Sequence, residues 1–206
     1  MRDTPSLEDD KNVLRRLARE MGFDSDWLTG RGLFTANKDV SNWRNITVEN
    51  ERVTGINWSY LASDFKGLSI PWHMLVKLTG LKTLNLSNNK LTYVNGINPI
   101  NSQVFKLTCL EELDLSWMHF TGEISKEFGK LTQLKSLRLQ NNKLTGEIPK
   151  ELSLLTGLEE LNLSGNKLSD EMPKKSGHVA TQKFLGKYRD KMVRLLILLI
   201  IFDHWM

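Results

Sequence analysis

The chain has 206 residues, of which 40% are hydrophobic and 25% are charged, proportions that are ordinary for a globular protein with one sizeable core. The net charge of +4 is mild, and the basic residues do not gather with aromatic residues into one stripe, so we expect no nucleic-acid partner. The single cysteine, Cys109, excludes a disulfide within the chain and favours a reducing compartment.

The N-terminal segment predicts one capped helix over residues 6–21. Ser6 suits the N-cap, and Asp9 three residues later completes a capping box. Apolar residues then recur at helical spacing from Val13 to Met21, and we interpret the helix as a cover for the open end of the segment that follows. Because the first ten residues contain no apolar stretch, they predict no secretion signal, and the chain as written is expected to be intracellular.

A loop and a strand pair are predicted after this helix. Residues 23–42 contain several turn-forming residues, and the polar turn at residues 49–51 joins two short β-type segments. We expect Trp27 and Trp43 to pack beneath the helix.

One pattern, L-x-x-L-x-L-x-x-N-x-L, then repeats along the chain. Copies begin at Leu134 and, 24 residues later, at Leu158; earlier copies begin at Leu81 and Leu110, and a degenerate copy begins at Val53. This pattern with this period is the signature of a leucine-rich repeat, in which each copy contributes one strand to a solenoid. Alternate residues of a strand point to opposite faces, so the leucines are predicted to fill a shared core.

The asparagine of the pattern has a predicted structural role. A tight coil buries backbone N–H and C=O groups that must be paired, and an asparagine amide can serve both kinds. We expect Asn89, Asn142 and Asn166 to pair with the backbone within and between adjacent coils. Met118 takes this place in the third copy, where we expect a weakened or water-filled connection.

Two further groups of motifs accompany the repeats. Trp27 precedes the segment W-x-x-I-T-V…R-V-T-x-I at residues 43–56, which begins at Trp43, and L-T-G-E-I-P and F-T-G-E-I occur at residues 144–149 and 120–124. In these motifs, residues 7–173 resemble leucine-rich-repeat proteins of plant and stramenopile type. The resemblance implies a right-handed arc, an α/β solenoid with a parallel concave sheet, similar to the repeat domains of receptor-like proteins. The cysteines that usually flank the cap of secreted plant members are missing, and no kinase motif follows.

We therefore divide the chain into an N-terminal cap (1–52), about five repeats (53–175) and a basic and apolar tail (176–206). The tail is predicted to be helical, and three interpretations are open: a cover for the last coil, a peripheral membrane contact through residues 181–206, or a non-homologous C-terminus. Its apolar run at residues 195–202 is far shorter than the ~20 residues needed to cross a bilayer.

The outward positions of the strands predict a concave binding face. Its aromatic residues and its arginine are types enriched at binding hot spots. The candidate partner-binding residues are Tyr60, Asn85, Asp114, Trp117, Arg138, Gln140 and Asn162. The charges on this face are equally consistent with a ligand surface and with a ladder of charges that satisfy one another, since Lys135 is expected between Glu111 and Glu159 and Asp114 beside Arg138.

The sequence contains little that indicates catalysis or cofactor binding. The histidines are scattered without metal-ligand spacing, and Asp114 and Ser116, which lie near His119, occupy ordinary repeat positions rather than those of a triad. No phosphate- or dinucleotide-binding glycine motif occurs. We expect no metal and no cofactor, and we predict a non-catalytic module that binds a protein or peptide. The alternative is a fragment or truncated form of a membrane leucine-rich-repeat receptor-like protein in defence or developmental signalling.

Overall fold

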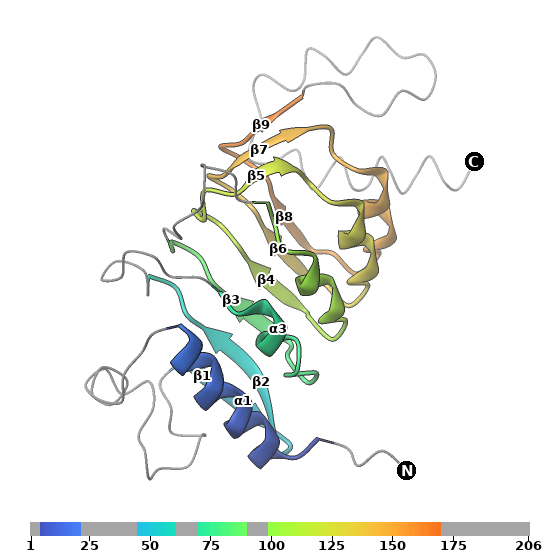
Figure 1. Cartoon of the computed structure of the whole chain (residues 1–206). Helices are drawn as coiled ribbons and strands as arrows, with labels where there is room; N and C mark the ends of the chain where they lie inside the picture. Colours follow the sequence, from blue (N-terminus) through green and yellow to red (C-terminus); the bar gives the residue numbers. More distant parts are fainter. Residues whose placement is uncertain (1–4, 22–44, 61–69, 90–98, 170–206) are drawn as a thin grey trace.

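The computed structural model describes residues 5–21, 45–60, 70–89 and 99–169, which form a stack of coils closed at one end by a helix (Figure 1). The helix, α1 (Leu7–Glu20), lies beside a hairpin made of β1 (Ile46–Glu49) and β2 (Arg52–Asn57). Each later coil adds one strand to the sheet, in the order β3 (Thr83–Asn85), β4 (Glu112–Asp114), β6 (Ser136–Arg138) and β8 (Glu160–Asn162).

These strands form a six-stranded sheet in the order β1-β2-β3-β4-β6-β8. The β1–β2 pair is antiparallel and every later pair is parallel. The central leucines of the repeats are neighbours across this sheet, since Leu84 aligns with Leu113, Leu113 with Leu137, and Leu137 with Leu161. The predicted solenoid and its register are therefore confirmed.

A second, three-stranded parallel sheet was not predicted. It consists of β5 (Thr121–Glu123), β7 (Lys143–Gly146) and β9 (Lys167–Leu168). β5 and β7 contain the threonine and glycine of the T-G-E-I motifs in the third and fourth coils, and β9 lies in the fifth coil. Each of these three coils therefore contributes two strands rather than one.

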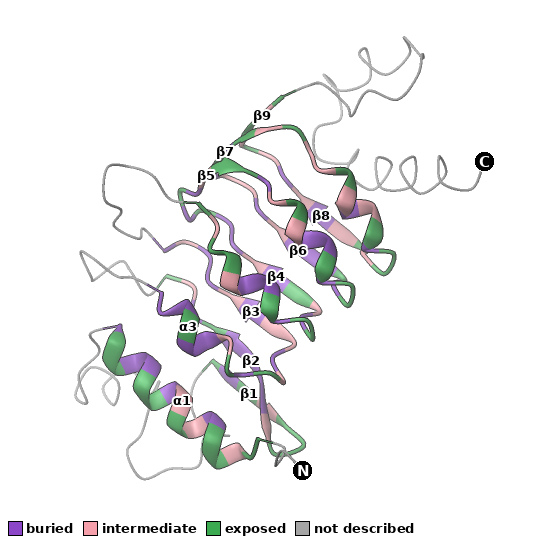
Figure 2. Ribbon diagram, turned by 45° about the vertical axis from the view of Figure 1, so that its right-hand side comes forward, coloured by how far each residue is buried: buried purple, intermediate pink, exposed green. Residues whose placement is uncertain are grey.

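The return segments of the coils carry short helices. These are α3 (Trp72–Leu75) and the 3-10 helices η4 (Ser102–Lys106), η5 (Lys126–Lys130) and η6 (Lys150–Leu154), and they lie across the core from the six-stranded sheet (Figure 1). Buried residues alternate with less buried ones along the strands (Figure 2). The leucines fill the interior, and Phe105 meets Phe128 edge to face with ring centroids 4.9 Å apart.

An asparagine ladder ties the coils together. Asn142 donates through Nδ2 to the carbonyls of Leu115 and Leu139, both at 2.9 Å, and its Oδ1 accepts from the backbone N–H groups of Met118 and Phe120 at 3.0 and 2.9 Å. In the same way, two other asparagines donate to carbonyls of their own coil and the preceding coil, namely Asn89 and Asn166.

Met118 stands in this ladder position in the third coil with a fully buried side chain. The carbonyls of Leu86 and Leu115, which an asparagine at this position could reach by analogy with Asn142, already accept from Asn89 and Asn142. The weakened connection expected at Met118 stays a prediction.

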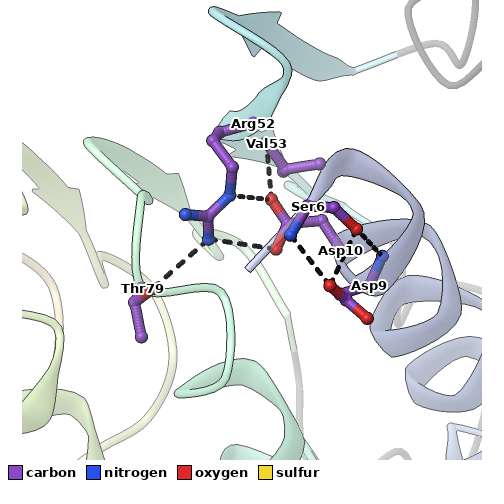
Figure 3. A network of polar contacts seen from close by, with 6 residues as sticks. All are labelled: Ser6, Asp9, Asp10, Arg52, Val53 and Thr79. Atoms are coloured by element: carbon purple, nitrogen blue, oxygen red, sulfur yellow. Dashed lines mark hydrogen bonds and ion pairs between the residues drawn. The ribbon is translucent and has the colours of Figure 1, made fainter. Parts of the chain in front are cut away.

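The N-terminal helix begins with the predicted capping box. The Ser6 hydroxyl accepts from the Asp9 backbone N–H at 3.3 Å, and the Ser6 N–H donates to the Asp9 carboxylate at 2.8 Å. One residue further on, Asp10 points toward the sheet, where it accepts from Arg52 and from the backbone of Val53 (Figure 3). The hydrogen bond that Arg52 donates to Asp10 raises the pKa of Arg52 above its ordinary value.

Some predicted features lie outside the described residues. They are the positions of Trp27 and Trp43 beneath the helix, and the tail at residues 176–206. In the part of the chain that the structure describes, no helix has the length and apolar character needed to span a membrane.

Candidate partner-binding face

We use the name concave face for the side of the six-stranded sheet that faces away from the core. It comprises the outward-facing residues within 54–60, 82–88, 111–117, 135–141 and 159–165. Adjacent strands lie about 4.8 Å apart, so equivalent residues of successive coils form rows across the face. Figure 2 shows intermediate or exposed residues between buried core residues along these strands, although some outward residues are themselves buried, namely Thr54, Ser87, Ser116 and Ser136.

The central row is anchored to the strand ends. The carboxylate of Asp114 accepts from the backbone N–H of Ser116 at 2.9 Å and from its hydroxyl at 2.6 Å. Asn162 makes the same two contacts with Ser164, at 3.1 and 2.8 Å. Asn85 accepts from the backbone of Ser87 at 2.9 Å. These three candidate residues therefore use one acceptor oxygen to stabilise their own turn, and only the rest of each side chain can serve a ligand.

Arg138 has a different partner from the one predicted. Its Nε and Nη2 donate to the two carboxylate oxygens of Glu160 at 2.8 and 2.6 Å, and the Ser136 hydroxyl adds a third bond to Glu160 at 2.9 Å. These contacts raise the pKa of Arg138 and lower the pKa of Glu160. Asp114 does lie beside Arg138 as expected, but the guanidinium forms its hydrogen bonds with Glu160, whose two oxygens accept in a bidentate arrangement.

The two lysines of the face are paired as well. Lys135 contacts Glu111 at 2.6 Å, which raises the pKa of Lys135 and lowers that of Glu111. Lys82 contacts Glu49 of β1 at 2.9 Å, and this bond raises the pKa of Lys82. The charge ladder therefore exists, although Lys135 bonds to Glu111 rather than bridging both of its acidic neighbours.

A row of left-handed residues ends the strands. Its members have φ between 57° and 67°, and they are Tyr60, Asn88, Trp117, Asn141 and Gly165. Asparagine and glycine are the residues that most readily adopt this conformation, and their recurrence at this position is the sequence signal from which the row could have been predicted. The two aromatic members project into solvent, with Tyr60 63% and Trp117 49% exposed.

Gln140 lies beside this row. Its backbone carbonyl accepts from the Trp117 N–H at 3.1 Å. Its side-chain Oε1 is buried without a hydrogen-bond partner among the described residues. Of the candidate residues, Trp117 and Tyr60 are thus exposed, whereas the polar members are partly buried and partly engaged in the fold.

A groove on another side of the molecule lies between the third and fourth coils. It is lined by residues 123–126 and 147–151, so His119 does not contribute to it. Within the described ranges, no three histidine, cysteine, aspartate or glutamate side chains come together in a way that could hold a metal ion.

Comparison with known proteins agrees with this architecture. Family profiles described as Leucine Rich repeats match residues 132–172, and those described as Leucine Rich Repeat match residues 80–102 and 109–131. A comparison with curated proteins found no match.

Three solved structures illustrate the similarity. A plant ice-binding protein is 25% identical with a TM-score of 0.65, and the match covers 78% of this chain but only 49% of that one, about half its length. A chain of the BIR3–SERK2 complex from Arabidopsis thaliana is 27% identical with a TM-score of 0.63, covering 78% of this chain and 84% of that one. Pollen Receptor Kinase 3 is 32% identical with a TM-score of 0.62, covering 80% and 75%.

Proposed function

Because the chain belongs to the leucine-rich-repeat proteins, we propose that it is a non-catalytic module that binds a protein or peptide on its concave face. The similarity to a chain of the BIR3–SERK2 complex supports this proposal, since that structure contains two proteins bound to each other. Fold alone does not determine function, so the proposal depends on what this face exposes.

The observation that carries the proposal is the exposed side chain of Trp117. Among the described residues, the large hydrophobic side chains that are exposed are those of Tyr60, Trp117 and Leu154. The first two lie in one row with one coil between them, which places them about 10 Å apart across the strands. Tryptophan and tyrosine provide rigid contact area and dominate many interfaces, so this row is where a partner would be anchored.

The experiment combines identification with direct binding. Proximity labelling with the intact chain in its own cell identifies candidate partners, and calorimetry with a purified partner measures the Kd. Trp117→Asn is expected to weaken binding by roughly tenfold or more, as for a hot-spot residue. Asparagine suits this position because Asn88 and Asn141 occupy it in neighbouring coils.

Leu154→Asn is the matched control, because Leu154 is 56% exposed but lies in η6, across the core from the concave face. We expect this variant to keep the wild-type Kd. If wild type and both variants bound the partner equally, the concave face would be excluded as the binding surface.

A second candidate is the ligand-binding part of a membrane receptor-like protein. The similarity to Pollen Receptor Kinase 3 favours it. Sequencing of the full-length transcript tests it, since a longer open reading frame with an apolar span of ~20 residues is what a membrane receptor requires. Flotation with liposomes, with and without residues 181–206, tests separately whether the tail contacts a membrane.

A further inference from the structure

The concave face is acidic although the whole chain is basic. Its charged residues are three cations and five carboxylates, namely Lys82, Lys135 and Arg138 against Glu111, Glu112, Asp114, Glu159 and Glu160, whereas the chain carries a net charge of +4. All three cations are neutralised by a carboxylate. The excess negative charge therefore belongs to the face itself and is not matched by its own basic residues.

The unmatched charge is concentrated on β4. Glu112 and Asp114 are two residues apart on this strand, so both side chains leave the same face of the sheet. Among the described residues neither forms an ion pair: Arg138 lies opposite Asp114 on the next strand, but its hydrogen bonds go to Glu160. Those bonds raise the pKa of Arg138 most, and the charges of Asp114 and Glu112 help to raise it. Within the same part of the chain, Asp114 accepts hydrogen bonds only through Oδ1, from Ser116. Glu112 is exposed and Asp114 is partly exposed.

An exposed indole follows these carboxylates on the same segment. Trp117 comes three residues after Asp114 and is 49% exposed at the turn that ends β4. An aromatic ring attracts a cation that lies over its face, and arginine is the commonest partner of this kind. Carboxylates on the same segment as an accessible ring are therefore complementary to a basic side chain, which could pair with the acids while its planar group or its stem covers the indole.

We propose that the concave face binds a basic segment of its partner, with an arginine or lysine placed over Trp117 and paired with Glu112 and Asp114. This inference rests on the proposed function and specifies the chemistry of the partner. Charge complementarity of this kind speeds association and selects against acidic competitors. It is weakened by salt, since the Debye length falls as ionic strength rises.

The test uses three fluorescent peptides of equal length and spacing that carry arginine, glutamine or glutamate at alternate positions, each titrated against the full chain by fluorescence anisotropy. The arginine peptide is expected to bind with a Kd roughly tenfold below that of the glutamate peptide, with the difference shrinking between about 50 mM and about 300 mM NaCl. The double variant Glu112→Gln/Asp114→Asn is expected to abolish this preference. Asparagine in place of Asp114 preserves the turn, since Asn85 and Asn162 make the same backbone contact.

Trp117→Asn is expected to weaken binding of the arginine peptide roughly threefold through loss of the cation–π contact. The matched control is Glu123→Gln/Glu147→Gln, which changes the net charge equally at two exposed positions of the groove away from the concave face. This control is expected to leave the Kd for the arginine peptide unchanged.

Four results would overturn the proposal. Equal, Trp117-dependent binding of all three peptides would keep the face as a binding surface but remove its preference for basic segments. If the control variant bound the arginine peptide as weakly as Glu112→Gln/Asp114→Asn does, the preference would come from the overall charge of the chain and not from β4. Failure of the arginine peptide to bind would reject the basic segment outright. Self-association of the chain, measured by light scattering and lost in Trp117→Asn, would assign the face to a second copy.

Discussion

Asp10 and Arg52 join the N-terminal helix to the sheet through two charge-assisted hydrogen bonds. The Asp10 carboxylate accepts from Arg52 Nε at 2.8 Å and from Nη2 at 3.2 Å, and it also accepts from the backbone N–H of Val53 at 2.9 Å (Figure 3). Asp10 is only 1% exposed, so these contacts replace the water that its charge has lost. Arg52 in turn donates to Thr79 at 3.2 Å, which extends the connection to the next coil.

Asp10→Asn should therefore destabilise the protein strongly. The amide is neutral and leaves Arg52 without its counter-ion, and breaking a buried pair on one side costs about 3 kcal/mol. The measurement is the free energy of unfolding from urea denaturation. Glu8→Gln is the control, because Glu8 lies on the same helix in exposed pairs with Lys11 and Arg15 and should cost less than about 1 kcal/mol. Equal losses would mean that the burial of Asp10 has no energetic consequence.

The asparagine ladder gives a second expectation. Asn142→Leu keeps the side-chain size but removes the hydrogen bonds to Leu115 O, Met118 N and Phe120 N, while Leu139 O retains its bond from Asn166. Each buried polar group that loses its partner costs about 1–3 kcal/mol, so the expected loss is at least about 3 kcal/mol in denaturant melts.

Met118→Leu changes the same ladder position one coil earlier, where an apolar side chain already stands. A swap between apolar residues of similar volume costs less than about 1.5 kcal/mol. If it proved as damaging as Asn142→Leu, the stability would come from packing at these positions and not from the hydrogen bonds of the ladder.

The solenoid could be predicted because the leucines that form its core recur periodically in the sequence. Leu84, Leu113, Leu137 and Leu161 occupy one position of a repeated pattern, and repeated patterns stack in register. The capping box of Ser6 and Asp9 was predictable for a local reason, since both partners lie within one turn. The second sheet was not predicted because its strands, such as Thr121–Glu123, are short and include a glycine, which weakens any strand signal.

The partners of the charged residues were harder to predict from the sequence. Arg138 has acidic neighbours on both adjacent strands: Asp114 lies directly opposite it on β4, whereas Glu160 on β8 lies opposite Ser136, two residues away. The register alone therefore favours Asp114. In the structure the longer glutamate meets the guanidinium with both oxygens, while Asp114 is held by Ser116. Which carboxylates of the concave face remain unpaired therefore depends on side-chain geometry that the repeat does not encode.

The Arg138–Glu160 pair should contribute to stability in a pH-dependent way. Hydrogen bonds from Arg138, and then from Ser136, lower the pKa of Glu160. A carboxyl group with a lower pKa in the folded state stabilises that state above its unfolded pKa, and this contribution is lost as the pH falls through the folded pKa. Glu160→Gln should thus cost up to about 1 kcal/mol at neutral pH, because the pair is partly exposed.

The difference between wild type and Glu160→Gln should then disappear between about pH 5 and about pH 3, as measured by urea denaturation across this range. Glu112→Gln is the reference, because Glu112 is an exposed glutamate of the same sheet that has no ion pair among the described residues. It is expected to leave the free energy of unfolding unchanged at neutral pH. A Glu160→Gln deficit that stayed constant down to pH 3 would show that its origin is not ionic.

Gly129 fixes the spacing between adjacent 3-10 helices. A Cβ at this position would lie 2.7 Å from the backbone oxygen of Glu151 in η6. Because that atom belongs to the backbone and not to a flexible side chain, it cannot easily move away. Gly129→Ala should therefore force the third and fourth coils apart and cost about 1–3 kcal/mol, measured as a lower Tm by calorimetry. At Gly157 the nearest atom to an added Cβ is the Leu134 carbonyl oxygen at 3.9 Å, so Gly157→Ala should be neutral or slightly stabilising. Similar Tm values for the two variants would contradict the close approach.

Substitutions of Trp117 can separate its proposed role in binding from any role in folding. It has φ of 58°, a conformation that costs an ordinary residue about 1–2 kcal/mol and that asparagine tolerates well. Trp117→Asn removes this cost but also loses the packing of a half-exposed ring, so we expect the free energy of unfolding to change by less than about 1 kcal/mol.

Trp117→Ala loses the same ring without gaining the left-handed preference of asparagine. It should be less stable than Trp117→Asn by about 0.5–1 kcal/mol, with equal m-values in urea showing that both variants bury the same surface. If the alanine variant matched or exceeded the asparagine variant in stability, the left-handed turn would impose no cost. If the order holds, Asn88 and Asn141 show the residue type that stability favours in this row, and loss of partner binding in Trp117→Asn can be assigned to the indole rather than to damage to the fold.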